Sequence, residues 1–206
     1  MTKKVAIING IAKLRRYNVL LEEKYRKLGF EPTQYQFNKY KIFCCHMHPS
    51  MEPQAAEIVE NADVIHCQSS SFFPVLPYMH KHNIKKPLIM ESPVLNSHTG
   101  TFYAAINRIK HYSEAEQNKF VNLFLDTFCF TPSWTKNIME ILDDYKNNNK
   151  ALVLATTLDG VSDIRGLEHN FHHIFDNGLH ARLFDKGTTN DWDIVVNYLK
   201  EYRENQ

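Results

Sequence analysis

Short apolar runs alternate with helical patterns along the whole chain. Runs typical of strands lie at 5–8, 33–37, 62–67, 87–90, 151–155 and 180–184. Patterns with helical spacing lie between and beyond them, at 17–28, 54–61, 71–82, 101–128, 133–145, 164–175 and 191–202. Strands that alternate with helices in this way form a parallel sheet with helices on both faces. The pattern therefore predicts an α/β fold, a three-layer sandwich around a mostly parallel sheet of about six strands.

Length and composition favour one globular domain. The 206 residues are 43% hydrophobic and 23% charged, a balance typical of folded chains. Because no repeat, low-complexity tract or linker divides the sequence, we predict a single domain over 1–206 with a helical insertion at about 100–147. The aromatic residues of that insertion have helical spacing, which is typical of plain core and also of a lid over an apolar pocket.

Charge and cysteine content exclude several classes of function. The net charge of +1 gives no basic excess for nucleic acid or for an anionic membrane surface. No apolar run reaches the roughly 20 residues of a membrane span, and the N-terminus lacks a signal-peptide pattern. The four cysteines are few and unevenly spaced, so we expect reduced thiols and a cytoplasmic location. With seven glycines and no glycine-rich phosphate-binding motif, a flavodoxin-like nucleotide or flavin binder is a weak alternative and we expect no cofactor. Association into a homodimer stays open.

A cluster of serines directly follows the third apolar run. The letters VIHCQSSSF indicate a strand, a sharp turn and the start of a helix. Such a turn brings the residues two before and two after its centre together, so both must be small. Ser69 has Cys67 and Ser71 at these places, whereas the corresponding neighbours of Ser70 are bulky. Ser69 is therefore the better candidate nucleophile, although serines at a helix start also serve as N-caps.

This order of elements and the C-x-S-x-S pattern resemble the α/β-hydrolase superfamily, whose usual pattern is G-x-S-x-G. The resemblance covers nearly the whole chain, without the usual leading β-hairpin, and implies a serine hydrolase acting on a small-molecule or acyl ester. In that superfamily the loop after the penultimate strand supplies the triad acid, a place held here by Asp159, with Asp163 as the alternative. The resemblance also implies an oxyanion hole from the backbone N–H of Ser70 and one near Ile11, after Gly10.

The general base of the superfamily is a histidine in the loop after the last strand. No histidine follows the run 180–184, and His180 begins that run, which in this prediction puts it at the opposite edge of the sheet. His98, in the loop after the strand at 87–90, is the first substitute, and His46 or His48 the second. Because a serine hydroxyl without a base is a weak nucleophile, the alternative function is a catalytically inactive relative that binds a partner or ligand through the same face.

Two clusters of histidine and cysteine invite a metal interpretation. The letters CCHMH at 44–48 lack a second ligand pair, and the histidines at 169, 172 and 173 do not form an H-E-x-x-H motif. We therefore expect no metal site.

Overall fold

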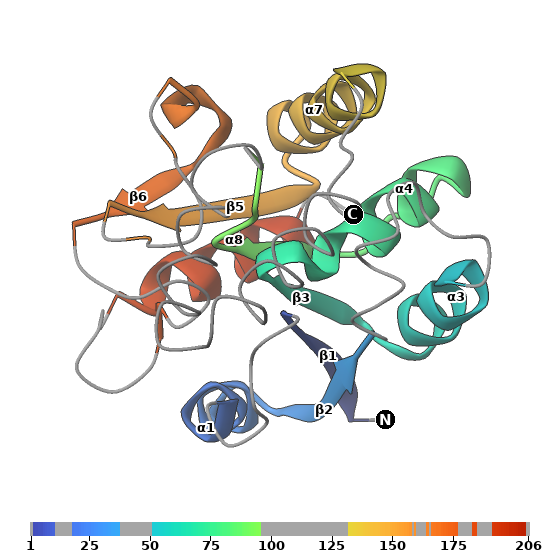
Figure 1. Cartoon of the computed structure of the whole chain (residues 1–206). Helices are drawn as coiled ribbons and strands as arrows, with labels where there is room; N and C mark the ends of the chain where they lie inside the picture. The colour runs from blue at the N-terminus through green and yellow to red at the C-terminus, as the bar shows by residue number, and fades with distance from the viewer. Residues whose placement is uncertain are drawn as a thin grey trace, which may run out of the picture.

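The computed structural model describes residues 2–10, 18–37, 51–95, 132–157, 159, 164, 166–176, 183–184 and 191–204, with side chains in the helix at 132–147 described from Lys136 onward. The strands are β1 (Lys3–Asn9), β2 (Phe30–Gln36), β3 (Val64–Gln68), β4 (Leu88–Glu91), β5 (Ala151–Thr156) and β6 (His173–Phe175). The helices are α1 (Val19–Lys27), α3 (Glu52–Asn61), α4 (Phe72–Lys81), α7 (Pro132–Asn147) and α8 (Asp193–Glu204), with short 3-10 turns η3 (Ser69–Ser71) and η4 (Glu168–Asn170) (Figure 1).

The six strands form one sheet in the order β2-β1-β3-β4-β5-β6, and every neighbouring pair is parallel. The predicted α/β class and strand number are thus confirmed. Ile8 is level with Cys67, and Gln68 is level with Glu91. The segments that leave β1, β3 and β4 therefore start side by side at the carboxyl edge of the sheet, where the functional loops of such folds lie.

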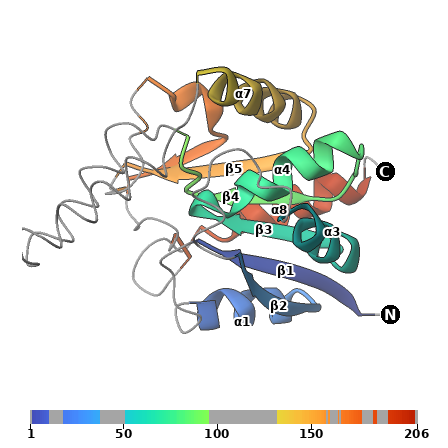
Figure 2. The ribbon, with the colours of Figure 1, turned by 45° about the vertical axis from the view of Figure 1, so that its right-hand side comes forward.

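Helices cover both faces of the sheet, so the molecule has three layers with the sheet in the middle (Figure 2). One core joins the sheet to α3, α4 and α7, with Ile58, Leu76 and Leu142 among its buried side chains. The other joins the sheet to α1 and α8, through residues such as Leu21 and Leu199. Apolar residues on alternate sides of β3 and β4 enter the two cores, which is why these strands read as continuous apolar runs.

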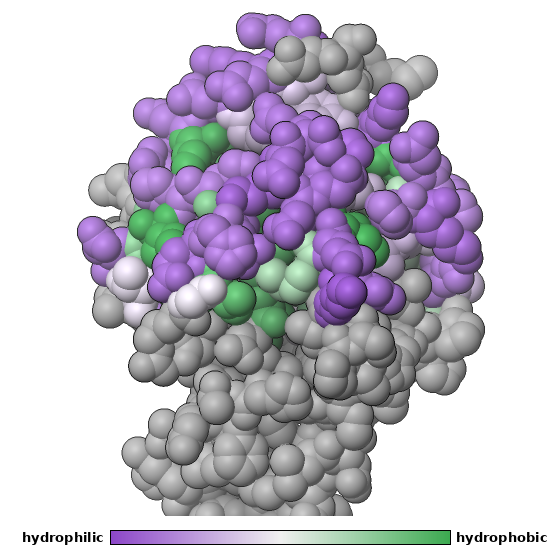
Figure 3. Space-filling model, turned by 90° about the horizontal axis from the view of Figure 1, so that it is seen from above, coloured by the Kyte–Doolittle hydropathy of each residue, from purple (hydrophilic) through white to green (hydrophobic). Residues whose placement is uncertain are grey.

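α7 belongs to the outer layer of the sandwich. Its apolar side chains Ile138, Leu142 and Tyr145 are buried against the sheet. Among the described residues on the face seen from above, most are hydrophilic and the hydrophobic ones form small separate areas (Figure 3). In the part of the chain that the structure describes, no helix is long and apolar enough to cross a membrane. The structure describes the insertion predicted at about 100–147 only from Pro132 onward, as α7, so the domain boundaries stay a prediction.

One stretch differs from the sequence-based expectation. Residues 164–175 were expected to form a helix and 180–184 the last strand, but the sixth strand is β6 at 173–175, preceded by η4. The apolar residues of this stretch have helical spacing, but Gly166 has a φ of +78°, which interrupts a right-handed helix. Instead, the strand that follows His172 pairs with β5, and the N–H of His172 donates to the carbonyl of Val153 at 2.8 Å.

Candidate active site

Ser69 occupies a strained turn between β3 and the helix that follows. β3 ends at Gln68, η3 begins at Ser69 and α4 begins at Phe72. The φ angle of Ser69 is +58°, in a region that costs a non-glycine residue about 1–3 kcal/mol. Such strain persists only where the surroundings enforce it, and it gathers at functional sites. The backbone at Ser69 thus makes the sharp strand-to-helix turn that presents a nucleophile above a sheet.

The two small residues that flank Ser69 are buried and held in place. Cys67 is 1% exposed and Ser71 is fully buried. The Ser71 hydroxyl accepts the backbone N–H of Gln68 at 2.9 Å and donates to the carbonyl of Ile8 at 2.9 Å, which ties the turn to β1. Burial raises the pKa of the Cys67 thiol far above its usual value, so Cys67 stays protonated and is no rival nucleophile.

Gly10 packs directly against Ser69. A Cβ atom at Gly10 would lie 2.7 Å from the Cβ of Ser69 and 3.1 Å from the carbonyl oxygen of Gln68, so only glycine fits. The chain that leaves β1 therefore passes beside the turn, where a backbone N–H could face an oxyanion. Ser70 is 6% exposed and lies in the first turn of the following helix, whose first N–H groups have no partner within the helix. Ile11 lies outside the described residues.

Asp159 follows β5, next to the chain that leaves β6. Its N–H donates to the carbonyl of Thr156 at 3.3 Å. The N–H of Thr157 donates to the carbonyl of Phe175 at 2.9 Å, and the Thr157 hydroxyl donates to the carbonyl of Asp176 at 3.3 Å. The turn that leads to Asp159 is therefore bonded to the last residue of β6 and to the first residue beyond it. Asp163 lies outside the described residues.

The histidines weighed as bases or metal ligands fall into two groups. His98, His46 and His48 lie outside the described residues. His169 and His172 are exposed, and His173 is half-buried at the start of β6. Within the ranges that the structure describes, no three histidine, cysteine or acidic side chains are grouped to hold a metal ion.

The position of β6 overturns the argument that excluded His180. His180 was predicted to begin the last strand, but that strand ends at Phe175. His180 therefore follows the last strand in the sequence and does not begin it. His180 lies outside the described residues, but residues on both sides of it, Asp176 and Leu183, are described.

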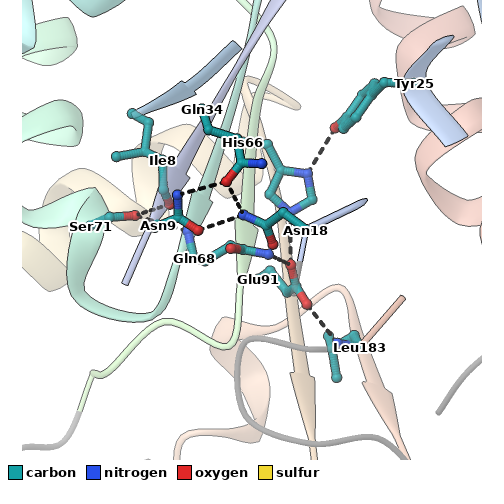
Figure 4. A network of polar contacts seen from close by, with 10 residues as sticks. All are labelled: Ile8, Asn9, Asn18, Tyr25, Gln34, His66, Gln68, Ser71, Glu91 and Leu183. Carbon is teal, nitrogen blue, oxygen red and sulfur yellow. Dashed lines mark hydrogen bonds and ion pairs between the residues drawn. The ribbon is translucent and has the colours of Figure 1, made fainter. Parts of the chain in front are cut away.

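A buried polar network that the sequence analysis missed lies under the same edge of the sheet (Figure 4). The Tyr25 hydroxyl is 2.8 Å from His66 Nδ1, and His66 Nε2 is 3.0 Å from Glu91 Oε2. Gln68 Nε2 donates to the same carboxylate oxygen at 2.6 Å. The backbone N–H of Leu183 donates to the other oxygen, Oε1, at 2.6 Å. The available signal was one polar residue inside each of two apolar runs, VIHC and LIME.

A second polar cluster joins the last residue of β1, Asn9, to Asn18, which precedes α1. Asn9 and Asn18 are fully buried, and the Asn18 amide donates to Asn9 Oδ1. The Asn9 amide donates to the carbonyl of Tyr35 at 3.0 Å and to Gln34 Oε1 at 3.3 Å (Figure 4). These bonds fix the two ends of the segment that begins at Gly10.

Comparisons by sequence found no relative. No protein-family model matches the chain, and no curated protein matches it.

Comparison with solved structures found similar folds. An esterase of Pyrococcus furiosus, Pf2001, aligns with a TM-score of 0.65 at 12% identity, over 97% of this chain and 82% of that chain. A second crystal form of that esterase gives a TM-score of 0.58 at 11% identity, over 97% and 81%. DcsB, solved in complex with its substrate analogue, gives 0.53 at 11% identity, over 98% and 90%. Likeness at such low identity is a likeness of fold. The sheet order, the helices on both faces and these structures together show that the chain has an α/β-hydrolase-like fold.

Proposed function

We propose that this protein is a serine hydrolase that cleaves an ester bond of a small-molecule or acyl substrate, with Ser69 as the nucleophile. The observation that carries the proposal is the left-handed backbone of Ser69 at the end of β3, with Gly10 packed against it. A serine that needed only to cap a helix has no reason to adopt a positive φ, whereas an exposed nucleophile at a strand-to-helix turn does.

The proposed base is His180. Asp176, four residues before it, is bonded to the turn that leads to Asp159. Leu183, three residues after it, is bonded to Glu91, which also binds the side chain of the residue before Ser69. At about 3.5 Å per residue, His180 has to lie within roughly 14 Å of Asp176 and 11 Å of Leu183. The described residues on both sides of His180 are thus bonded to the turn that leads to Asp159 and, through Glu91, to the strand of the candidate nucleophile. His98, the base expected from the sequence, is the other candidate.

The reaction follows from these roles. The base takes the proton of the Ser69 hydroxyl as its oxygen attacks the ester carbonyl, and Asp159 orients the protonated base. The backbone N–H groups of Ser70 and Ile11 stabilise the oxyanion that forms. The alcohol leaves with the proton from the base, and a water molecule, deprotonated by the same base, then releases the acid and restores Ser69.

Intact mass after exposure to a fluorophosphonate tests the nucleophile. We expect the wild-type protein to gain one phosphonyl group and Ser69→Ala to gain none. Ser70→Ala is the matched control, because it removes a neighbouring hydroxyl and leaves the turn. No labelling of the wild type, under conditions that label a known esterase, would count against the hydrolase and favour an inactive binding protein with this fold.

Hydrolysis of a p-nitrophenyl ester tests the base. We expect His180→Ala to lower kcat by about a thousandfold or more, as the loss of a triad member does, and His98→Ala to leave it within about threefold. The reverse order would assign the base to His98. Equal, small effects of both variants would contradict the proposed triad.

A further inference from the structure

Glu91 is a buried carboxylate with an unusual number of donors around it. It is 1% exposed and is the last residue of β4, at the carboxyl edge of the sheet. Gln68 and the backbone of Leu183 each donate to it at 2.6 Å, and His66 Nε2 lies 3.0 Å away. A carboxylate is costly to bury unless such partners surround it. Both carboxylate oxygens of Glu91 therefore act as hydrogen-bond acceptors.

A chain of hydrogen bonds leads from Tyr25 through His66 to Glu91. Burial, and next the negative charge of Glu91, raise the pKa of Tyr25 well above its usual value, so the phenol keeps its proton. The Tyr25 hydroxyl lies 2.8 Å from His66 Nδ1, and the other ring nitrogen, Nε2, lies 3.0 Å from Glu91 Oε2. His66 therefore links Tyr25 to the carboxylate, to which Gln68 and Leu183 bond directly.

The two oxygens of Glu91 reach two different parts of the candidate active site. Oε2 binds Gln68, the residue directly before Ser69. Oε1 binds Leu183, which lies three residues beyond His180. In Figure 4 the carboxylate stands between the Gln68 side chain and the Leu183 backbone, which belong to segments far apart in sequence. Glu91 is in this way a bridge between the strand of the nucleophile and the segment that follows β6.

We infer that Glu91 is a positioning residue for the hydrolase reaction, which holds the backbone at Leu183 at a fixed distance from the nucleophile turn. The inference rests on the proposed function, because it assigns Glu91 no contact with substrate. A displacement of about 1 Å between a base and a nucleophile can lower a rate by about 100-fold, so a bridge of the right length matters more than its charge.

Two substitutions separate length from charge. Glu91→Asp keeps the carboxylate but is one methylene shorter, so it cannot reach Gln68 and Leu183 together. Glu91→Gln keeps the length. Its amide oxygen can accept the N–H of Leu183. Its NH₂ group can donate to the Gln68 side-chain oxygen, after the Gln68 amide rotates by 180°, and to His66 Nε2 when that nitrogen carries no proton. Tyr198→Phe is the matched control, because Tyr198 bonds the carbonyl of Lys150 on the same face of the sheet, away from Glu91.

The test compares ester hydrolysis by these variants. We expect Glu91→Asp to lower kcat by about 10- to 100-fold with KM changed less than about threefold, and Glu91→Gln to stay within about fivefold of wild type. A purely electrostatic role predicts the opposite order of the two variants. A role in stability alone predicts that Tyr198→Phe, at equal loss of thermal stability, lowers kcat as much as Glu91→Asp. Either result overturns the inference.

Hydrogen exchange at the Leu183 amide tests the bridge without any substrate. We expect slow exchange in the wild type and in Glu91→Gln, and faster exchange in Glu91→Asp. Fast exchange in the wild type would overturn the inference, whatever the activity. If the wild type takes up no fluorophosphonate while Leu183 stays protected, the proposed function fails, and the catalytic role of Glu91 fails with it although the bond exists.

Discussion

The left-handed backbone of Ser69 can be measured as a free energy. We expect Ser69→Gly to be more stable than Ser69→Ala by about 1 kcal/mol or more, because both lose the hydroxyl and only glycine adopts a φ of +58° without strain. In a chain of this length such a difference corresponds to roughly 2–4 °C in Tm, measurable by differential scanning calorimetry.

The same pair of substitutions at Ser70 provides the control. Ser70 lies inside η3, where alanine is expected to be more stable than glycine by about 0.5–1 kcal/mol. An equal preference for alanine at both positions would show that the Ser69 turn stores no strain, and would remove the main support for a nucleophile there.

Gly10 is the second residue on which the turn depends. In Gly10→Ala the new methyl group would meet the Cβ of Ser69 at 2.7 Å, a contact that real side chains do not make. We expect the variant to lose about 1–3 kcal/mol of stability and most of the labelling of Ser69 by a fluorophosphonate, because the turn has to move. Chemical denaturation and intact mass measure the two effects.

Gly29→Ala separates displacement from strain alone. Gly29 has a φ of +81° with nothing within 4 Å of an added Cβ, and it precedes β2 at the amino edge of the sheet. It should cost a similar amount of stability and leave labelling unchanged. Normal labelling in Gly10→Ala would place the substrate path elsewhere.

At the scale of elements, the junction of β5 with the segment before β6 should respond to pH. The backbone N–H of Val153 donates to His172 Nδ1 at 3.1 Å. Partial burial, and next the positive charge of Lys146, lower the pKa of His172. The unfolded chain therefore takes up this proton at a higher pH than the folded chain does. The stability that neutral His172 contributes is complete above about pH 6.5 and is lost as the pH falls through the folded pKa.

His172→Asn removes this titration and keeps an acceptor for Val153, because an asparagine Oδ1 takes the place of Nδ1. We expect its free energy of unfolding to fall less than that of the wild type between about pH 7 and pH 5, in urea titrations at several pH values. Parallel curves for the two proteins would show that His172 takes no part in acid destabilisation.

The elements that the sequence predicted correctly are those with one strong signal. β1, β3, β4 and β5 lie in short, mostly apolar runs, which few other structures explain. The stretch 164–175 failed because its apolar residues fit a helix, and the effect of Gly166 depends on a φ angle of +78° that the letters do not show. Because of that error, His180 was excluded as a base. The exclusion assumed that His180 begins the last strand, and it fails when the strand ends at Phe175.

The parts of the candidate site that depend on neighbouring residues in the sequence were predictable. The small residues around Ser69, and Gly10 after the first strand, are visible in the sequence itself. The pairing of Glu91 with Gln68 is not, because it depends on the register of β3 against β4, and the register of two separate strands is set by the whole sheet.

At the scale of the whole molecule, one sheet separates two cores. Tyr198 of α8 links a helix to two strands, since its hydroxyl donates to the carbonyl of Lys150 at 2.9 Å and accepts the N–H of Leu88 at 3.3 Å. Burial raises the pKa of Tyr198, so the hydroxyl stays a donor. Because both cores are built on the same strands, neither can unfold while the other keeps its packing. We therefore predict that residues 1–206 unfold as one domain.

Two probes on opposite faces of the sheet can test that prediction. Trp192 packs edge-on against Tyr25 and Phe184 in one core, and in a Trp134→Phe background it is the only tryptophan. Cys67 is buried in the other core, and with the three other cysteines changed to serine its thiol reacts only after unfolding. We expect tryptophan fluorescence and thiol labelling to give the same urea midpoint and free energy of unfolding within about 0.5 kcal/mol.

Adding Tyr198→Phe should lower both values together, by about 1–3 kcal/mol, because it removes bonds to strands that the two cores share. Separate midpoints, or a Tyr198→Phe effect on the fluorescence transition alone, would mean that the faces unfold independently. The single domain predicted from the sequence would then be wrong, and the nucleophile turn, which lies above β3 at the meeting of both cores, would lose its support whenever either core opened.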